Sequence, residues 1–290
     1  MGAMFSHLYP PAPSLTETNL PPQTGKIFLI TGGASGIGYE LARILYYTGD
    51  TVYIAGRSER NALANIEKYK SSPHLHVLSN NAGVSLPPQG SVSKQNIELQ
   101  LATNCLGPYL LTQLLLPILS ATASTSALAT TRVIWTSSQM VDLGAAKGGG
   151  CDPASPTTTA QSKNYTLSKV GNWFLASELA GQVHAQGILS TTQNPGNLKT
   201  NLLRHAPAMM RWLSAPLLHN PKMGAYTALW AGAAPDLSLD AGGGYVIPWG
   251  MMHPCPRADL IMALKSQEEG GTGRARDFAE WCEGQVGEFR

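Results

Sequence analysis

From Lys26 onward, the chain alternates short β-rich apolar runs with stretches whose apolar residues recur at helical spacing, and this alternation limits the possible folds most. Strands are expected at Ile27 to Ile30, Thr51 to Ala55, Leu75 to Leu78, Arg132 to Thr136, Gly187 to Thr192 and Gly244 to Ile247. Helices are expected at Tyr39 to Tyr47, Glu59 to Lys70, Asn96 to Leu119, Tyr165 to Val183 and Met223 to Ala233. Apolar strands that alternate with helices predict an α/β fold, a single doubly wound parallel sheet covered on both faces.

Composition agrees with one large domain and excludes several classes of protein. Of 290 residues, 43% are hydrophobic and 13% are charged, which is enough apolar content for one buried core. Twenty Lys and Arg against eighteen Asp and Glu leave a net charge of +2, and no basic cluster stands out. Such a chain has no field that would hold a polyanion, so we expect no nucleic-acid partner.

The cysteines and histidines give no sign of a disulfide framework or a metal site. Cys105, Cys151, Cys255 and Cys282 lie far apart without paired spacing, and the seven histidines lack the spacing of metal ligands. We therefore expect free thiols in a reducing compartment and no bound metal.

The first residues and the most apolar stretch both favour a cytoplasmic protein. Five prolines and no basic start before an apolar run predict that residues 1–24 form an arm that lies along the domain or frays. The domain is expected at residues 25–265, followed by a partly helical tail at 266–290. Tyr109 to Leu119 is far shorter than the roughly 20 residues of a membrane span, so it predicts a buried helix, and no membrane association is indicated.

A glycine-rich loop, Thr31-Gly-Gly-Ala-Ser-Gly-Ile-Gly38, lies where the first expected strand meets the first expected helix. Gly32 permits a tight turn, Gly36 allows a pyrophosphate to approach the backbone, and Gly38 lets the helix pack on the strand. The helix N-terminus adds free N–H groups and partial positive charge. Taken alone, the motif leaves a second interpretation open, a glycine-rich turn without a ligand.

With this loop the chain resembles the short-chain dehydrogenase/reductase family, whose glycine spacing is TGxxxGxG, and within it a fungal branch akin to retinol dehydrogenases. The resemblance runs from about Gly25 to about Trp249. Further family motifs follow in order: Asn80-Asn-Ala-Gly83, Asn104, Ser137-Ser138, Tyr165-Thr-Leu-Ser-Lys169, and Asn194-Pro-Gly196 with Thr200. The resemblance implies a Rossmann-like dinucleotide-binding and catalytic domain, a small-molecule substrate and interconversion of an alcohol and a carbonyl. A homodimer is left open.

The family pattern also implies individual roles. A serine matching Ser138, the second of the pair Ser137-Ser138, orients the substrate oxygen, and an asparagine matching Asn104 holds a water in a proton relay. Lys169 bonds the nicotinamide ribose. The implied catalytic residues are Ser138, Tyr165, Lys169 and Asn104. The implied cofactor-binding residues are Gly32, Ser35, Gly36, Ile37, Gly38, Arg57, Asn81, Ala82, Gly83, Tyr165, Lys169, Pro195, Gly196, Leu198 and Thr200.

The chemistry of Tyr165 and Lys169 can also be argued from the residues themselves. They are four residues apart, which places both side chains on one face of a helix. A phenol with a pKa near 10 is a poor acid-base catalyst at neutral pH, but an adjacent ammonium favours the phenolate. The pair in isolation would fit an exposed tyrosine and a solvated lysine, whereas the ordered motifs favour a general acid/base with a lysine that lowers its pKa.

The end of the second expected strand bears on the choice of cofactor. The sequence there is Ala55-Gly56-Arg57-Ser58, so a guanidinium stands where an acidic residue would bond a ribose 2′-hydroxyl. Arg57 therefore favours NADP(H) over NAD(H), and the alternative is an exposed arginine at a helix start.

Residues 198–223 are expected to form the lid over the substrate. Met209, Met210, Trp212, Leu213, Leu217 and Leu218 make this segment apolar. Its composition favours a lipophilic or aromatic substrate, with plain packing of a helix pair as an equal alternative.

A segment present in the family is missing here. Only 20 residues separate Ala55 from Leu75, room for one helix, and residues 60–80 contain no Asp to contact the adenine. We expect the usual third strand and its following helix to be absent and the strand at Thr51 to Ala55 to form a sheet edge. The competing hypothesis for function is thus a non-catalytic or impaired dinucleotide-binding scaffold. The right-handed crossover rule would place the helix at Glu59 to Lys70 on the sheet face opposite the helix at residues 36–47, whereas in the family it lies on the same face. We expect the family position.

Overall fold

The computed structural model describes residues 10–56, 74–151, 157–158, 160–204, 209, 212 and 215–289. Its centre is a seven-stranded sheet in the order β2-β1-β3-β4-β5-β6-β7, parallel except for β7 at one edge. The strands are β1 (Ile27–Thr31), β2 (Thr51–Ala55), β3 (Val77–Asn80), β4 (Thr131–Thr136), β5 (Ile188–Gln193), β6 (Tyr245–Ile247) and β7 (Met251–Met252).

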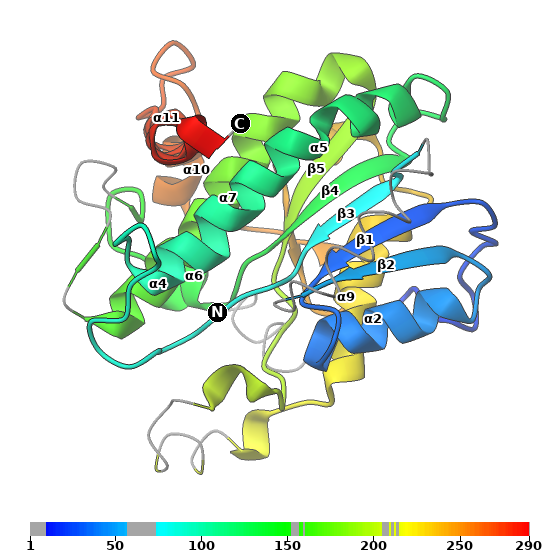
Figure 1. Cartoon of the computed structure of the whole chain (residues 1–290), viewed down its shortest axis with the longest axis horizontal. Coiled ribbons are helices and arrows are strands. Elements are labelled where there is room, and N and C mark those ends of the chain that lie inside the picture. The colour runs from blue at the N-terminus through cyan, green and yellow to red at the C-terminus, as the bar shows by residue number, and fades with distance from the viewer. Residues whose placement is uncertain are drawn as a thin grey trace.

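Helices cover both faces of this sheet (Figure 1). One face carries α5 (Gly107–Ala123) and α7 (Gln161–Val183), and α2 (Gly36–Tyr46) and α9 (Pro221–Ala233) pack together on the other. The short helices are α4 (Leu99–Leu101), the π-helix η1 (Ala102–Leu106), α6 (Met140–Gly144), α10 (Ala258–Leu264) and the 3₁₀ turns η2 (His184–Gln186), η3 (Asn201–Leu203), η4 (Ala215–Leu217), η5 (Leu239–Ala241) and η6 (Gly287–Phe289). The doubly wound α/β fold is confirmed.

Alternating strand side chains divide the interior into two apolar cores. On β4, for example, Val133 and Trp135 face the α5 and α7 layer, whereas Ile134 faces the α2 and α9 layer. Each core is buried because the strands present apolar residues to both faces, as expected for a sheet covered on both sides.

A helix at the C-terminal end of the described chain closes the first core. α11 (Arg274–Val286) lies against α7, and its buried side chains include Ala275, Phe278 and Cys282. The ring of Phe278 contacts that of Phe174 edge-on, with 6.2 Å between centroids. This region is thus part of the packed domain.

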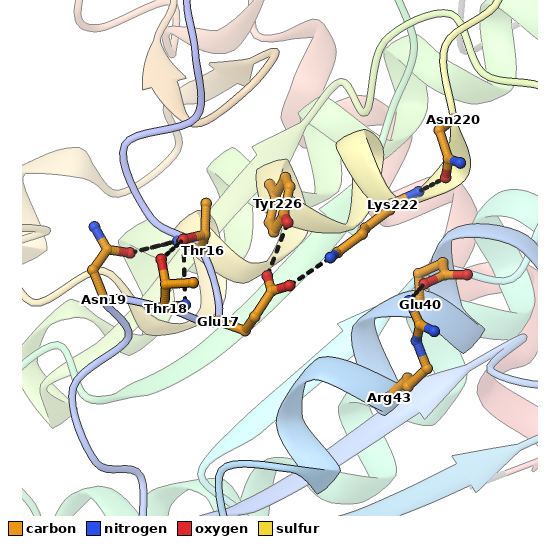
Figure 2. A network of polar contacts seen from close by, with 9 residues as sticks. All are labelled: Thr16, Glu17, Thr18, Asn19, Glu40, Arg43, Asn220, Lys222 and Tyr226. Atoms are coloured by element: carbon orange, nitrogen blue, oxygen red, sulfur yellow. Dashed lines mark hydrogen bonds and ion pairs between the residues drawn. The ribbon is translucent and has the colours of Figure 1, made fainter.

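The N-terminal segment lies along the domain from residue 10 onward. Leu15 is buried in the α2 and α9 core. Figure 2 shows the Glu17 carboxylate between two side chains of α9: it accepts hydrogen bonds from Lys222 Nζ at 2.5 Å and from the Tyr226 hydroxyl at 2.8 Å. These contacts fasten the segment to the start of α9, where the expected lid ends.

The helix expected to be buried, Tyr109 to Leu119, is only partly so. Leu119 is buried, but Leu114 is 53% exposed. Within the described residues, one helical stretch, Leu99–Ala123, has the length and apolar composition of a membrane span. The buried core helix of a soluble protein passes the same test, so this finding is weak evidence for a membrane.

β2 lies at the edge of the sheet and pairs with β1 along its whole length. No side chain of β2 is buried, whereas every side chain of β3, β4 and β5 is. Among the described residues no strand lies on its outer side. The expected helix at Glu59 to Lys70 lies outside the described residues, so the sheet face that it covers stays a prediction.

Candidate active site

The glycine-rich loop joins β1 to α2 at the carboxyl edge of the sheet. Gly32 has φ +69°, a left-handed conformation that favours glycine, and a Cβ on it would lie 3.0 Å from the Ala82 Cα. A Cβ on Gly38 would lie 2.6 Å from Asn81 Nδ2 and 2.8 Å from the Gly32 oxygen. The loop therefore packs directly against the segment that follows β3, with no room for side chains at these two positions.

The N-terminus of α2 is open to an anion. The N-cap residue Ser35 makes no side-chain capping bond, and the first turn holds no acidic residue. No capping or acidic side chain therefore occupies the first N–H groups of the helix, and the helix dipole favours negative charge there.

Thr31 and Asn81 fix the ends of β1 and β3 relative to each other. Thr31 Oγ1 accepts hydrogen bonds from the backbone N–H of Asn81 at 3.0 Å and of Ala82 at 2.9 Å, and Asn81 Nδ2 donates to the Thr31 carbonyl at 2.9 Å. These hydrogen bonds thus hold the loop and the Asn81-Ala82-Gly83 segment in a fixed position relative to each other.

Helix α7 carries Tyr165 and Lys169 on one face, as expected. The helix begins at Gln161, four residues before the expected start, so Tyr165 lies in its second turn. Lys169 Nζ lies 5.6 Å from the centroid of the Tyr165 ring. A Cβ placed on Gly83 would lie 3.5 Å from Lys169 Nζ, which shows that the lysine reaches the carboxyl end of β3.

Burial decides the pKa of both side chains. Lys169 is 3% exposed, and desolvation lowers its pKa to about 8, with Cys105 acting in the opposite direction. Desolvation raises the pKa of Tyr165, and a hydrogen bond with Ser138 partly opposes this rise. The expectation that the ammonium lowers the tyrosine pKa is therefore not met in this geometry, where burial dominates and Lys169 Nζ donates to the Thr136 carbonyl at 3.0 Å.

The two serines after β4 have different surroundings. Ser137 is 2% exposed, and its Oγ donates to the Lys169 carbonyl at 2.7 Å. Ser138 is partly exposed, and its Oγ accepts a hydrogen bond from the Met140 N–H at 3.2 Å. Ser138 is therefore the serine that faces Tyr165, while Ser137 holds the backbone of α7.

Asn104 lies in the π-helical turn η1 and is buried. Its Nδ2 donates to the Val84 carbonyl at 3.0 Å and to Ser168 Oγ at 2.9 Å, and its Oδ1 accepts from the Val84 N–H at 2.8 Å. In this structure the side chain thus positions the segment after β3. π-Helical turns often mark functional sites, which agrees with this location.

The segment after β5 closes the site from the side opposite β3. Gly196 has φ +86°, and a Cβ on it would lie 2.9 Å from the Trp249 ring. A Cβ on Gly36 would lie 3.5 Å from Thr200 Cγ2, so this segment meets the glycine-rich loop. Leu198 pairs with His219 in an isolated parallel bridge, which joins the two ends of the expected lid.

The structure thus brings together nearly all of the expected site residues, at the carboxyl ends of β1, β3, β4 and β5, where doubly wound folds bind ligands. Arg57 lies outside the described residues.

Several supporting residues were missed from the sequence. Asn172 donates to the Thr136 carbonyl at 2.8 Å, beside Lys169, and its place one turn after Lys169 was a usable signal. Tyr245 donates to the Ser138 carbonyl at 2.7 Å from a distant strand, a contact that local sequence does not reveal.

Comparisons with known proteins identify relatives of the whole chain. No family model matches the chain. A short-chain dehydrogenase/reductase of Pestalotiopsis fici is 37% identical, over 97% of this chain and 96% of its own length. Another, of Neocamarosporium betae, is 35% identical over 100% of this chain and 94% of its own length.

Solved structures share the fold at lower identity. An uncharacterised protein of Mycobacterium paratuberculosis aligns with a TM-score of 0.65 at 24% identity, over 94% of this chain and 97% of its own. The RhlG/NADP complex of Pseudomonas aeruginosa aligns with a TM-score of 0.58 at 24% identity, over 80% of this chain and 98% of its own.

The alignment with the Neocamarosporium relative also bears on chain length. It covers 332 positions, whereas this chain contributes all of its 290 residues. The relative therefore has residues for which this chain has no counterpart.

Proposed function

Because this chain belongs to the short-chain dehydrogenase/reductase family of oxidoreductases, we propose that it interconverts an alcohol and a carbonyl on a lipophilic or aromatic small molecule, with NADP(H) as cofactor. The observation that carries the proposal is the grouping of Ser138, Tyr165 and Lys169, with Lys169 near Gly83 of the segment against which the glycine-rich loop packs.

The residues present fit a nicotinamide dinucleotide. Gly32 and Gly38 let the loop backbone pack closely on the segment after β3, and the uncapped start of α2 suits a pyrophosphate. Asn81 to Gly83, Pro195, Gly196, Leu198 and Thr200 would hold the remaining parts of the cofactor, and Lys169 would bond its ribose. Arg57 would take the 2′-phosphate, which supports NADP(H) over NAD(H).

Each side chain of the site has its own role in the proposed reaction. A bound nicotinamide supplies or accepts the hydride. Ser138 Oγ orients the substrate oxygen, and the Tyr165 hydroxyl gives that oxygen a proton in reduction or takes one in oxidation. Lys169, with positive charge near neutral pH, stabilises the phenolate that Tyr165 then carries. Asn104 holds the segment beside the site in place.

Tyr165→Phe tests the proposed role directly. The variant should lose turnover and keep cofactor binding, because only the acid-base oxygen is removed. Turnover is measured on a panel of ketones and aldehydes, and binding by nicotinamide fluorescence. A residual rate above about a hundredth of the original is incompatible with a positioned acid, whose contribution is at least about 10²-fold.

Arg57→Ala tests the cofactor preference. We expect NADPH binding to weaken by about 1.5–3 kcal/mol, the scale of a charge-assisted hydrogen bond, and NADH binding to stay nearly unchanged. Equal losses for both cofactors would refute the 2′-phosphate contact.

A second candidate function is an impaired or non-catalytic dinucleotide-binding scaffold. The short interval between β2 and β3 favours it, since the adenine would lose one wall of its site. Cofactor binding without turnover on any member of the carbonyl panel would select this candidate.

A further inference from the structure

Tyr245 is a buried tyrosine at the start of β6, only 2% exposed. Its hydroxyl donates to the Ser138 carbonyl at 2.7 Å and lies 3.3 Å from Ser137 Oγ. Ser137 Oγ in turn donates to the Lys169 carbonyl at 2.7 Å. One phenol is therefore linked to the backbones of two residues of the proposed site.

The ring of Tyr245 is itself held from two sides. Trp173 of α7 packs edge-on at 4.8 Å between centroids, with its Nε1 donating to the Gly243 carbonyl at 2.9 Å. His253 packs edge-on from the other strand at 6.0 Å, and its backbone N–H donates to the Tyr245 carbonyl at 2.7 Å. The hydroxyl thus has one well-defined direction.

His253 also lies close to the residues that follow Ser138 in the sequence. Its Nδ1 accepts from the Cys255 N–H at 3.1 Å, which leaves Nε2 as the protonated nitrogen, 3.4 Å from Asp142 Oδ2 on α6. The backbone of Ser138 is consequently held at its carbonyl by Tyr245, and His253 lies beside the helix that follows it.

We propose that Tyr245 is a positioning residue for Ser138: its hydroxyl fixes the Ser138 carbonyl and so directs the Ser138 side chain toward Tyr165. A phenylalanine would fill the same buried space without an oxygen to desolvate, so the burial of this hydroxyl is offset by the hydrogen bond that it donates. Small displacements of a reacting group can lower a rate by about 10²-fold, so a contact of this kind can matter for turnover. The inference rests on the proposed function of Ser138.

Tyr245→Phe should lower kcat by about tenfold or more and leave the cofactor Kd unchanged. The same substitution in a Ser138→Ala background should change kcat less than about twofold, because the group through which Tyr245 acts is gone. The matched control is Tyr226→Phe, which removes a tyrosine hydroxyl bonded to Glu17 on the other sheet face and should leave kcat unchanged. A loss of kcat in Tyr245→Phe that is equally large with and without Ser138 would overturn the proposal.

A second measurement does not depend on turnover. The Val141 N–H donates to the same Ser138 carbonyl at 3.0 Å, so losing the Tyr245 hydroxyl should speed amide hydrogen exchange in residues 138–144. Unchanged exchange in Tyr245→Phe would also overturn the proposal. If the wild type turned over no carbonyl compound, the proposed function would fail, and this measurement would still decide the role of Tyr245.

Discussion

At the scale of single residues, Lys169 is a buried cation whose surroundings disfavour its charge. The residue is 3% exposed, and burial lowers its pKa to about 8, so the fold makes the charged form less favourable although the ammonium still predominates at pH 7. The carbonyl of Thr136 accepts from both Lys169 Nζ and Asn172 Nδ2, so it would keep a partner if the lysine were replaced. Lys169 thus costs stability at neutral pH, which a purely structural residue would not need to do.

Replacing Lys169 with Met should therefore make the protein more stable and less active. The lysine pKa is lower in the folded state than its usual value of 10.5, so the unfolded chain binds more protons between about pH 8 and 10.5. The free energy of unfolding of the wild type then rises with pH through this window, and the penalty is fully present below pH 8. We expect Lys169→Met to add up to about 3 kcal/mol at pH 7.

This difference is measured by urea unfolding of both proteins at pH 7 and at pH 10. The advantage of Lys169→Met should shrink toward pH 10, where the folded wild-type lysine is already neutral and the unfolded one begins to lose its proton. A variant that is less stable than the wild type at pH 7 would contradict the prediction.

At the scale of elements, the contact of α11 with α7 supports the helix that carries Tyr165 and Lys169. A Cβ on Gly171 would lie 2.6 Å from the Phe278 ring, so the ring occupies the space that a side chain on α7 would take. Phe278 is fully buried and also stacks on Trp281 at 5.6 Å. This ring therefore fills the space between the two helices.

Phe278→Ala should lower the free energy of unfolding by about 3–5 kcal/mol, because it leaves a cavity between two helices. Arg276→Ala on the same helix is the control: its side chain is 70% exposed and the loss should stay within about 0.5 kcal/mol. Chemical denaturation measures both. Equal losses in the two variants would show that Phe278 does not hold the contact.

Most of the sheet could be predicted from sequence because its parallel strands are unbroken β-rich runs. β7 could not, since a strand of two methionines has no periodicity to recognise. The buried positions of α11, namely Ala275, Phe278, Ala279, Cys282 and Val286, do recur at helical spacing, but charged residues between them hide the pattern.

The site was predictable where it follows strand ends, because parallel strands bring their carboxyl ends to one edge. The direction in which the Tyr165 pKa shifts could not be predicted, since it depends on burial by residues far away in sequence. The contact of Tyr245 with Ser138 joins positions 107 residues apart and needed coordinates.

At the scale of the whole molecule, β2 is the edge strand of the sheet among the described residues. β2 has no buried side chain, and the 332-position alignment leaves residues of the relative without a counterpart in this chain. We propose that these residues include the third strand and its following helix, which in the family complete the adenine side of the site.

The prediction is that this chain binds NADP(H) more weakly than full-length relatives, with a Kd above about 1 µM, and turns over slowly or not at all. Isothermal titration with NADPH measures the affinity, and the carbonyl panel measures turnover. Inserting the relative's extra segment between β2 and β3 should tighten binding. Submicromolar affinity with ordinary turnover in the unaltered chain would refute the prediction.

The bridge between Leu198 and His219 has a consequence for how readily new specificities can arise. The N–H of Lys199 donates to the His219 carbonyl at 2.9 Å and that of His219 to the Asn197 carbonyl at 2.8 Å, so both ends of the intervening segment are anchored. Once the ends of a loop are joined, doubling its length costs only about 0.6 kcal/mol of closure entropy. We therefore propose that residues 201–218, the expected lid, can be shortened, extended or exchanged while Ser138, Tyr165, Lys169 and Thr200 keep their places, so that specificity can diverge without rebuilding the catalytic residues.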